Sequence, residues 1–180
     1  MSGSKKSESK KSVSMKSESE KVYHNIPPLW NSESKVLILG SFPSPKSRSQ
    51  GFFYGHPQNR FWKVLAGVFD EKVPQTIEEK KALVLSHNIA MWDTIKECEI
   101  TGASDTSIKN PVPNDLAGII HESCIKNIFC TGAASYKYYE KLCEKDTGIK
   151  AVQLPSTSPA NAAWSLERLI ETYRVIKECV

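Results

Sequence analysis

The chain has 180 residues, of which 39% are hydrophobic and 24% are charged, with a formal net charge of +4. This length and composition are typical of one globular domain with a substantial core. No apolar run approaches the roughly 18 residues of a membrane span, and the chain lacks the charged-then-apolar start of a signal peptide. We therefore expect no membrane association and an intracellular location, in the cytoplasm or nucleoid, or in the nucleus if the source is eukaryotic.

The five cysteines are widely spaced, and no C-x-x-C pair occurs among them. This spacing argues against a zinc or iron–sulfur site. Reduced thiols fit an intracellular chain better than disulfides do. We expect neither a metal nor a cofactor.

Residues 1–21 form a tail rich in Ser, Lys and Glu, which we expect to be disordered because it offers too few apolar side chains to offset the entropy cost of ordering. Its six lysines and three glutamates supply +3 of the net charge, and the remaining 18 basic and 17 acidic side chains nearly cancel. A weak electrostatic tether to a polyanion is the alternative interpretation of the tail. The bulk charge of the folded domain, residues 22–180, argues only weakly for nucleic acid.

Apolar runs alternate with helical patterns along this domain. In chain order, the patterns predict strands at 35–39, 89–92, 125–131 and 151–154, and helices at 61–69, 77–85, 115–122, 133–144 and 162–178. Thr76 with Glu79 three residues later is a capping box for the second helix. Residues 94–114, which contain Gly102, Pro111 and Pro113, are interpreted as a loop.

Strands that alternate with helices predict an α/β fold, a three-layer α/β/α sandwich around a central, mostly parallel four-stranded sheet. The strands ending at Leu39 and Leu154 both run into loops rich in Ser and Pro. The carboxyl ends of parallel strands lie at one edge of a sheet, so these loops can face each other across one cleft. The first loop has about 17 residues, a length that indicates function.

These two loops carry recognisable motifs. Gly-Ser-Phe-Pro-Ser occupies residues 40–44, Gly-Phe-Phe-Tyr-Gly-His-Pro-Gln-Asn-Arg-Phe-Trp occupies 51–62, and Leu-Pro-Ser-Thr-Ser-Pro-Ala-Asn occupies 154–161. They resemble motifs 1 and 2 of the uracil-DNA glycosylase superfamily, with the greatest similarity to its hypoxanthine-DNA (DNA-deoxyinosine) glycosylase branch. The resemblance runs from about residue 22 to the C-terminus.

Two positions depart from the pattern of most of the superfamily. Phe42 stands where a catalytic Asn or Asp is usual, and a phenyl ring can neither orient water nor accept a proton. Ser156 stands where many relatives have His or Asn. The hypoxanthine branch shares the first departure and relies on a later Asn, which is Asn59 in this sequence.

The resemblance implies a DNA repair enzyme that flips a deaminated nucleotide, preferentially deoxyinosine, out of the helix and hydrolyses its N-glycosidic bond. It implies Asn59 as the catalytic residue, a monomer, and double- or single-stranded DNA as the partner. The implied substrate-binding residues are Gly40, Ser41, Phe42, Tyr54, His56 and Ser156. The implied DNA-binding residues are Ser44, Lys46, Ser47, Arg48, Ser158, Pro159, Ala160 and Asn161, with Ala160 at the position of a larger apolar wedge in relatives.

Simpler roles stay open for several of these residues. Tyr54 can be plain core, and His56 can fix the loop by a hydrogen bond. Asn59 can cap the helix that follows it. Asp105 and Asp115 are exposed-loop carboxylates by default, and either can serve as a second catalytic group.

Three other functions also stay open. A uracil- or mismatch-specific DNA glycosylase would use the same fold. An α/β hydrolase would use Ser41 or Ser156 as its nucleophile, but the sequence lacks the G-x-S-x-G motif. A module that binds altered bases without cutting DNA would need no catalytic residue at position 42, which would explain why Phe42 stands there.

Overall fold

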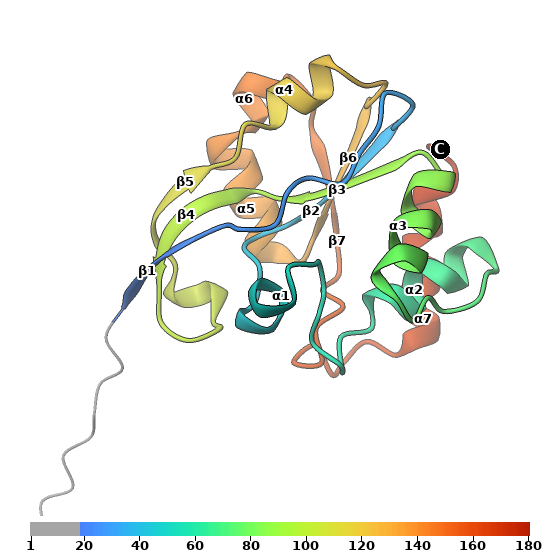
Figure 1. Cartoon of the computed structure of the whole chain (residues 1–180), viewed down its shortest axis with the longest axis horizontal. Coiled ribbons are helices and arrows are strands. Elements are labelled where there is room, and N and C mark those ends of the chain that lie inside the picture. Colours follow the sequence, from blue (N-terminus) through green and yellow to red (C-terminus); the bar gives the residue numbers. More distant parts are fainter. Residues whose placement is uncertain (1–18) are drawn as a thin grey trace, which may run out of the picture.

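The structure, a computed structural model, describes residues 19–180. At its centre lies a four-stranded sheet in the order β3-β2-β6-β7, in which every neighbouring pair is parallel (Figure 1). Its strands are β2 (Val36–Gly40), β3 (Ile89–Asp93), β6 (Asn127–Thr131) and β7 (Ala151–Leu154). The four strands predicted from the apolar runs are thereby confirmed.

Helices cover both faces of this sheet, which confirms the three-layer α/β/α architecture (Figure 1). One face carries α2 (Phe61–Phe69), α3 (Ile77–Ser86), α7 (Leu166–Tyr173) and the 3-10 turn η2 (Arg174–Ile176). The other carries α4 (Leu116–His121), α5 (Ala133–Leu142) and α6 (Glu144–Thr147). No helix between residues 19 and 180 combines the length and the apolar character of a membrane span.

Strand β2 is the centre of the core, because all five of its residues are buried. Its side chains alternate between the two faces of the sheet. Val36 and Ile38 pack into the core under α2, α3 and α7, whereas Leu37 and Leu39 pack into the core under α4 and α5. Burial on both faces explains why this strand is a continuous apolar run.

Local capping signals set the starts of the helices. Thr76 Oγ1 accepts from Glu79 N at 3.1 Å, and the Glu79 carboxylate accepts from Thr76 N at 3.2 Å, so the predicted capping box of α3 is confirmed. The helix predicted at 162–178 is shorter, because Ser165 caps α7 and residues 174–176 tighten into η2. Helix α1 (Pro45–Gln50) lies within the first loop, where only a loop was expected.

A second sheet, antiparallel and in the order β1-β4-β5, corrects the interpretation of residues 94–114 as a loop. Its strands are β1 (Glu20–Tyr23), β4 (Ile95–Ile100) and β5 (Lys109–Pro113), and the 3-10 turn η1 (Asp105–Ser107) joins the last two. Register shifts in β4 break the alternation that marks a strand. Strand β5 lies at the edge of the sheet, where its two prolines are tolerated.

The predicted boundary of the tail is also corrected. Glu20 and Lys21 belong to β1 and pair with Ile100 and Glu99, so the prediction of disorder to residue 21 is wrong at these positions. The rest of that prediction, at residues 1–18, lies outside the described residues. An edge strand is held by main-chain hydrogen bonds, so β1 needs only one buried apolar side chain, Val22.

We expect a chain that starts at Val22 to be less stable than one that starts at Ser19, because it lacks the first two pairs of the β1–β4 ladder. Each ladder hydrogen bond removed should lower the free energy of unfolding by about 1 kcal/mol. Urea unfolding of both chains and of the full chain measures this. Equal midpoints for the Val22 and Ser19 chains would show that the pairs made by Glu20 and Lys21 contribute nothing to stability.

Candidate active site

A cavity of about 310 Å³ opens at the carboxyl edge of the parallel sheet. Gly40 ends β2, Asp93 ends β3 and Thr131 ends β6, and all three line it together with the loop after β7. The predicted meeting of the two loops across one cleft is therefore confirmed. The lining residues are Gly40, Ser41, Phe42, Pro43, Ser44, Ser47, Phe53, Tyr54, His56, Asn59, Asp93, Ala103, Asp105, Thr131, Ser156, Thr157, Ser158 and Pro159.

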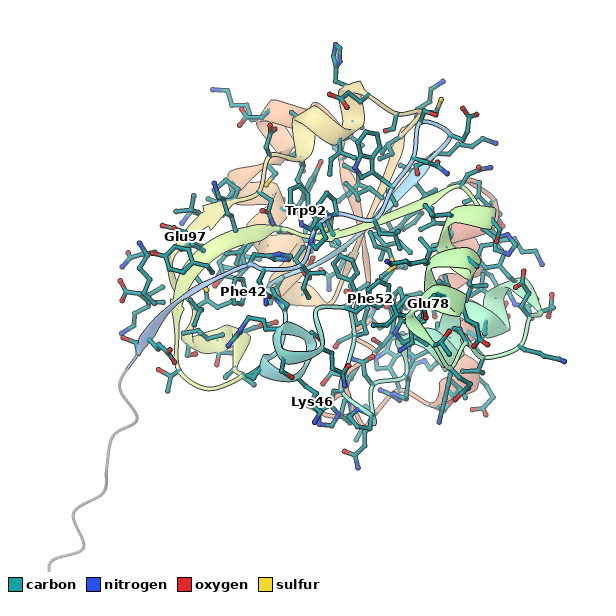
Figure 2. The ribbon with its side chains drawn as sticks, viewed as in Figure 1. Phe42, Lys46, Phe52, Glu78, Trp92 and Glu97 are labelled. Atoms are coloured by element: carbon teal, nitrogen blue, oxygen red, sulfur yellow. The ribbon has the colours of Figure 1, made fainter. Side chains whose placement is uncertain are left out.

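All but four of the residues singled out from the motifs line this cavity. The four outside the lining are Lys46, Arg48, Ala160 and Asn161. Figure 2 shows Lys46 pointing away from the ribbon of α1 into solvent. Sequence reasoning missed Asp93, Thr131 and Thr157. Thr131 is the last residue of a predicted strand and Asp93 directly follows one, and such positions are themselves a signal for a ligand site.

Tyr54 forms part of the cavity wall in a strained conformation, with a φ of 50°. Its ring stacks on Phe61, with centroids 3.9 Å apart and 7° between the planes. Its hydroxyl is 2.8 Å from Thr131 Oγ1, which in turn donates to Leu39 O at 3.2 Å. Burial raises the pKa of Tyr54 well above 10.0, so the phenol is neutral at physiological pH. Phe61 and Thr131 thus hold the Tyr54 ring in place in the cavity wall.

The oxygen and the nitrogen of the Asn59 side-chain amide have different surroundings. Its Oδ1 accepts from Phe61 N at 2.9 Å and from Thr157 Oγ1 at 2.8 Å. The oxygen therefore accepts from the first main-chain N–H of α2 and ties α2 to the second loop. Asn59 is not the N-cap of α2, because that position is Arg60, which makes no side-chain cap hydrogen bond. Within residues 19–180 the amide nitrogen has no hydrogen-bond partner, so it is available to a ligand in the cavity.

Arg60 holds the second loop by hydrogen bonds to its main-chain oxygens. Its guanidinium donates to the main-chain oxygens of Ser158 and Asn161, both at 3.0 Å, and to that of Trp164. Its main-chain N–H donates to Thr157 O at 3.1 Å. Charge-assisted hydrogen bonds of this kind are among the strong ones. Motif 1 therefore positions motif 2 largely through Arg60, a side chain that sequence reasoning did not single out.

His56 and Ser156 make local contacts at the cavity rim. His56 is exposed, its Nδ1 accepts from Gln58 N at 3.2 Å, and its carbonyl accepts from Asn59 N at 2.9 Å. This arrangement matches the structural alternative for His56. Ser156 Oγ accepts from Ser158 N at 3.2 Å, which shapes the second loop.

The first loop is braced by residues that were assigned to DNA. Ser44 Oγ accepts from Ser47 N at 3.2 Å and caps α1, and Ser47 Oγ accepts from Gly55 N at 3.0 Å. Arg48 donates to Pro43 O at 3.0 Å and lies over the Phe42 ring, 5.4 Å from its centroid. Phe42 itself is 7% exposed and packs into a small core on the second sheet, with Val22, Ile95 and Cys98 among its neighbours.

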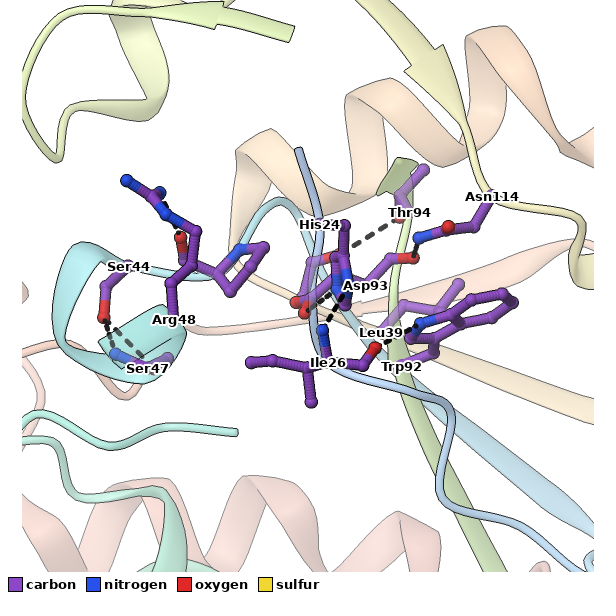
Figure 3. A network of polar contacts seen from close by, with 12 residues as sticks. His24, Ile26, Leu39, Ser44, Ser47, Arg48, Trp92, Asp93, Thr94 and Asn114 are labelled. Atoms are coloured by element: carbon purple, nitrogen blue, oxygen red, sulfur yellow. Dashed lines mark hydrogen bonds and ion pairs between the residues drawn. The ribbon is translucent and has the colours of Figure 1, made fainter. Parts of the chain in front are cut away.

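Two carboxylates lie in the cavity wall. Asp105 Oδ2 accepts from Ser41 Oγ at 2.7 Å. Burial raises the pKa of Asp105 above its ordinary value, the Ser41 hydrogen bond opposes this rise, and the nearby Asp93 adds to it. Asp93 Oδ2 is 2.8 Å from His24 Nε2 (Figure 3). Asp115 instead caps α4 through Gly118 N, so of the two alternatives for a second catalytic group only Asp105 reaches the cavity.

Proteins of known family are similar to this chain along most of its length. Residues 27–178 match the model of the uracil DNA glycosylase superfamily. A Methanosarcina acetivorans protein named hypoxanthine DNA glycosylase is 30% identical over 157 residues, which cover 87% of this chain and 99% of the relative. The protein of the same name from Methanosarcina barkeri is 30% identical over 139 residues, covering 76% and 86%.

A solved structure shares the fold. It is a solution NMR structure of a Methanosarcina acetivorans protein assigned provisionally as a uracil DNA glycosylase, with a TM-score of 0.72 and 26% identity over 86% of this chain and 98% of that one. Together with the family match, this similarity confirms the resemblance predicted from the two loops.

We expect Arg60→Lys to destabilise the second loop, because an ammonium cannot reach the several carbonyl oxygens that the guanidinium fork holds. The free energy of unfolding should fall by about 2–3 kcal/mol, and limited proteolysis should cut near residues 155–161. Arg168→Lys is the matched control, since that exposed side chain stacks only on Trp164. Equal stability and equal cleavage of the two variants would contradict the role given to Arg60.

Proposed function

Because the chain belongs to the uracil DNA glycosylase superfamily, we propose that it is a monomeric DNA glycosylase that removes deaminated bases, hypoxanthine before others, from intracellular DNA. The observation that carries the proposal is the meeting of Tyr54, Asn59 and Ser156 around one cavity at the carboxyl edge of the sheet. The hypoxanthine DNA glycosylases of Methanosarcina support the choice of base.

In the proposed reaction the target nucleotide leaves the base stack and enters the cavity. Its base stacks on the exposed side of the Tyr54 ring, whose other face is held by Phe61. The C1′–N9 bond breaks and its electron pair leaves with the purine, while water adds its oxygen to C1′ and releases a proton. The sugar develops positive charge and the base negative charge.

The chain offers a group for each developing charge. The Asn59 amide nitrogen and the main-chain N–H groups of Ser41 and Phe42 donate to the departing purine. The carboxylate of Asp105, in the cavity wall, places negative charge beside the sugar. Lys46, at the exposed rim, and the serines of the two loops contact phosphates and position the DNA.

A deoxyinosine-containing oligonucleotide tests the proposal directly. After incubation with the protein and treatment with alkali, the strand breaks only where a base has been removed. A module that binds without cutting leaves the strand intact but retards it in a gel. A hydrolase that uses Ser41 or Ser156 as nucleophile leaves it intact and turns over activated esters.

We expect deoxyinosine to be processed much faster than deoxyuridine in matched sequence contexts. Phe42 occupies the position from which uracil-directed relatives present an amide or carboxylate, and its ring is buried in the small core. Single-turnover rates on duplexes that differ only at the target base measure the preference. Equal or faster release of uracil would exclude hypoxanthine as the main substrate.

We expect Asn59→Ala to slow base release by about 100- to 1000-fold, the effect of losing one preorganised donor to a developing charge. It also removes the acceptor for Phe61 N, and the loss of that hydrogen bond should lower the free energy of unfolding by about 1 kcal/mol. Asn59→Asp separates the two roles, because it keeps the acceptor for Phe61 N and Thr157 but removes the N–H donor.

Melting and single-turnover rates are measured on the same preparations. A slow but stable Asn59→Asp variant assigns the effect to the amide nitrogen. Full activity in a folded Asn59→Ala variant would remove Asn59 from the mechanism.

A further inference from the structure

A buried carboxylate, Asp93, lies in the cavity wall and has no part in the reaction described above. Asp93 ends β3 and pairs in register with Gly40, the last residue of β2. It is 6% exposed and lines the cavity. Trp92, the residue before it, was predicted as the end of the strand, and nothing in the motifs pointed to Asp93.

One oxygen of the Asp93 carboxylate, Oδ2, is hydrogen-bonded within the protein. His24 Nδ1 accepts from Ile26 N at 3.2 Å, so the proton of the neutral imidazole is on Nε2, which donates to Asp93 Oδ2 at 2.8 Å (Figure 3). The two side chains are 2% and 8% exposed. The Asp93 main-chain oxygen is held as well, by Asn114 Nδ2 at 2.8 Å. His24 thus orients the carboxylate of Asp93, and Asn114 holds its main chain.

The other oxygen, Oδ1, is available. No polar group of residues 19–180 hydrogen-bonds it, and no buried side-chain oxygen or nitrogen in that part of the chain lacks a partner. Oδ1 must then be accessible from the cavity that Asp93 lines. Gly40 makes room for it, because a Cβ at residue 40 would lie 2.2 Å from Oδ1 and 3.7 Å from the Tyr54 hydroxyl.

Deamination changes the edge of a purine in a way that a carboxylate detects. Adenine has a lone pair at N1, whereas hypoxanthine has an N1–H donor there. A carboxylate only accepts hydrogen bonds, so it attracts the N1–H of hypoxanthine and repels the N1 lone pair of adenine. An amide in the same place can present either end.

We propose that Asp93 Oδ1 accepts the N1–H of the flipped hypoxanthine and so distinguishes the deaminated base from adenine, with His24 as the positioning residue. The inference rests on the proposed function, because it concerns the same cavity. It assigns the selection of the base to a carboxylate outside both motifs, whereas Asn59 and the main-chain N–H groups act on the leaving charge.

Asp93→Asn is the sharpest test, since His24 Nε2–H will hold the new amide oxygen and turn the NH2 group into the cavity. The acceptor then becomes a donor without a change in volume. The probes are duplexes with hypoxanthine or with unsubstituted purine (nebularine), which has a lone pair at N1 and no 6-oxygen. The ratio of their single-turnover rates cancels effects on the sugar that the two share, and the ratio of their binding constants is measured alongside.

We expect the preference for hypoxanthine over purine to fall roughly 10- to 100-fold in Asp93→Asn, the value of one hydrogen bond to a charged group. His24→Leu should also lower the preference for hypoxanthine over purine. His24→Gln, which can still donate to Asp93 Oδ2, should restore that preference. Glu97→Gln, a carboxylate change on β4 outside the cavity, is the matched control and should leave the ratio unchanged.

Each other outcome has a distinct meaning. If Asp93→Asn slows both substrates equally, Asp93 acts on the sugar or the water and the proposal is wrong. It is equally wrong if the ratios of rate and binding stay at the wild-type value in a folded Asp93→Asn variant. If the wild-type protein prefers to bind the hypoxanthine duplex but releases no base, the proposed function fails, and the binding ratio of Asp93→Asn still decides the role of Asp93.

Discussion

The site depends on the close approach of two parallel strand ends. β2 and β3 pair in register up to Gly40 and Asp93, and the missing side chain of Gly40 leaves room for the Asp93 carboxylate. Thr94 reinforces the junction, because its N–H and its hydroxyl both donate to Gly40 O, at 2.9 and 3.1 Å. The position of the Asp93 carboxylate at the cavity therefore follows from the pairing of two strands of the central sheet.

The second sheet completes this junction. His24 directly follows β1 and contacts the buried side of Asp93. β4 follows β3 along the chain, and η1 after it carries Asp105, which lies in the cavity wall. Phe42 packs the first loop against this sheet. A side chain that lacks catalytic chemistry thus has a packing role, since it joins the cavity wall to the second sheet.

The central sheet and most of the cavity could be predicted because the relevant signals are local. A continuous apolar run marks β2, a capping box marks α3, and the long aromatic loop places Tyr54 and Asn59 together. The second sheet could not be predicted, since bulges in β4 disturb its alternation and β1 has one buried apolar side chain. Asp93 and its partner His24 lie 69 residues apart, so no spacing rule links them.

The anchoring of the second loop has a consequence for how this surface meets a polyanion. Main-chain oxygens carry partial negative charge and would oppose phosphates if they pointed outward. Those of Thr157, Ser158 and Asn161 turn inward to Arg60, and that of Ser156 turns to Asn161 Nδ2. The positive charge of Arg60 thus interacts with main-chain oxygens inside the protein, and the outer face of the loop becomes less negative without a surface cation of its own. This agrees with a domain whose overall charge is nearly balanced.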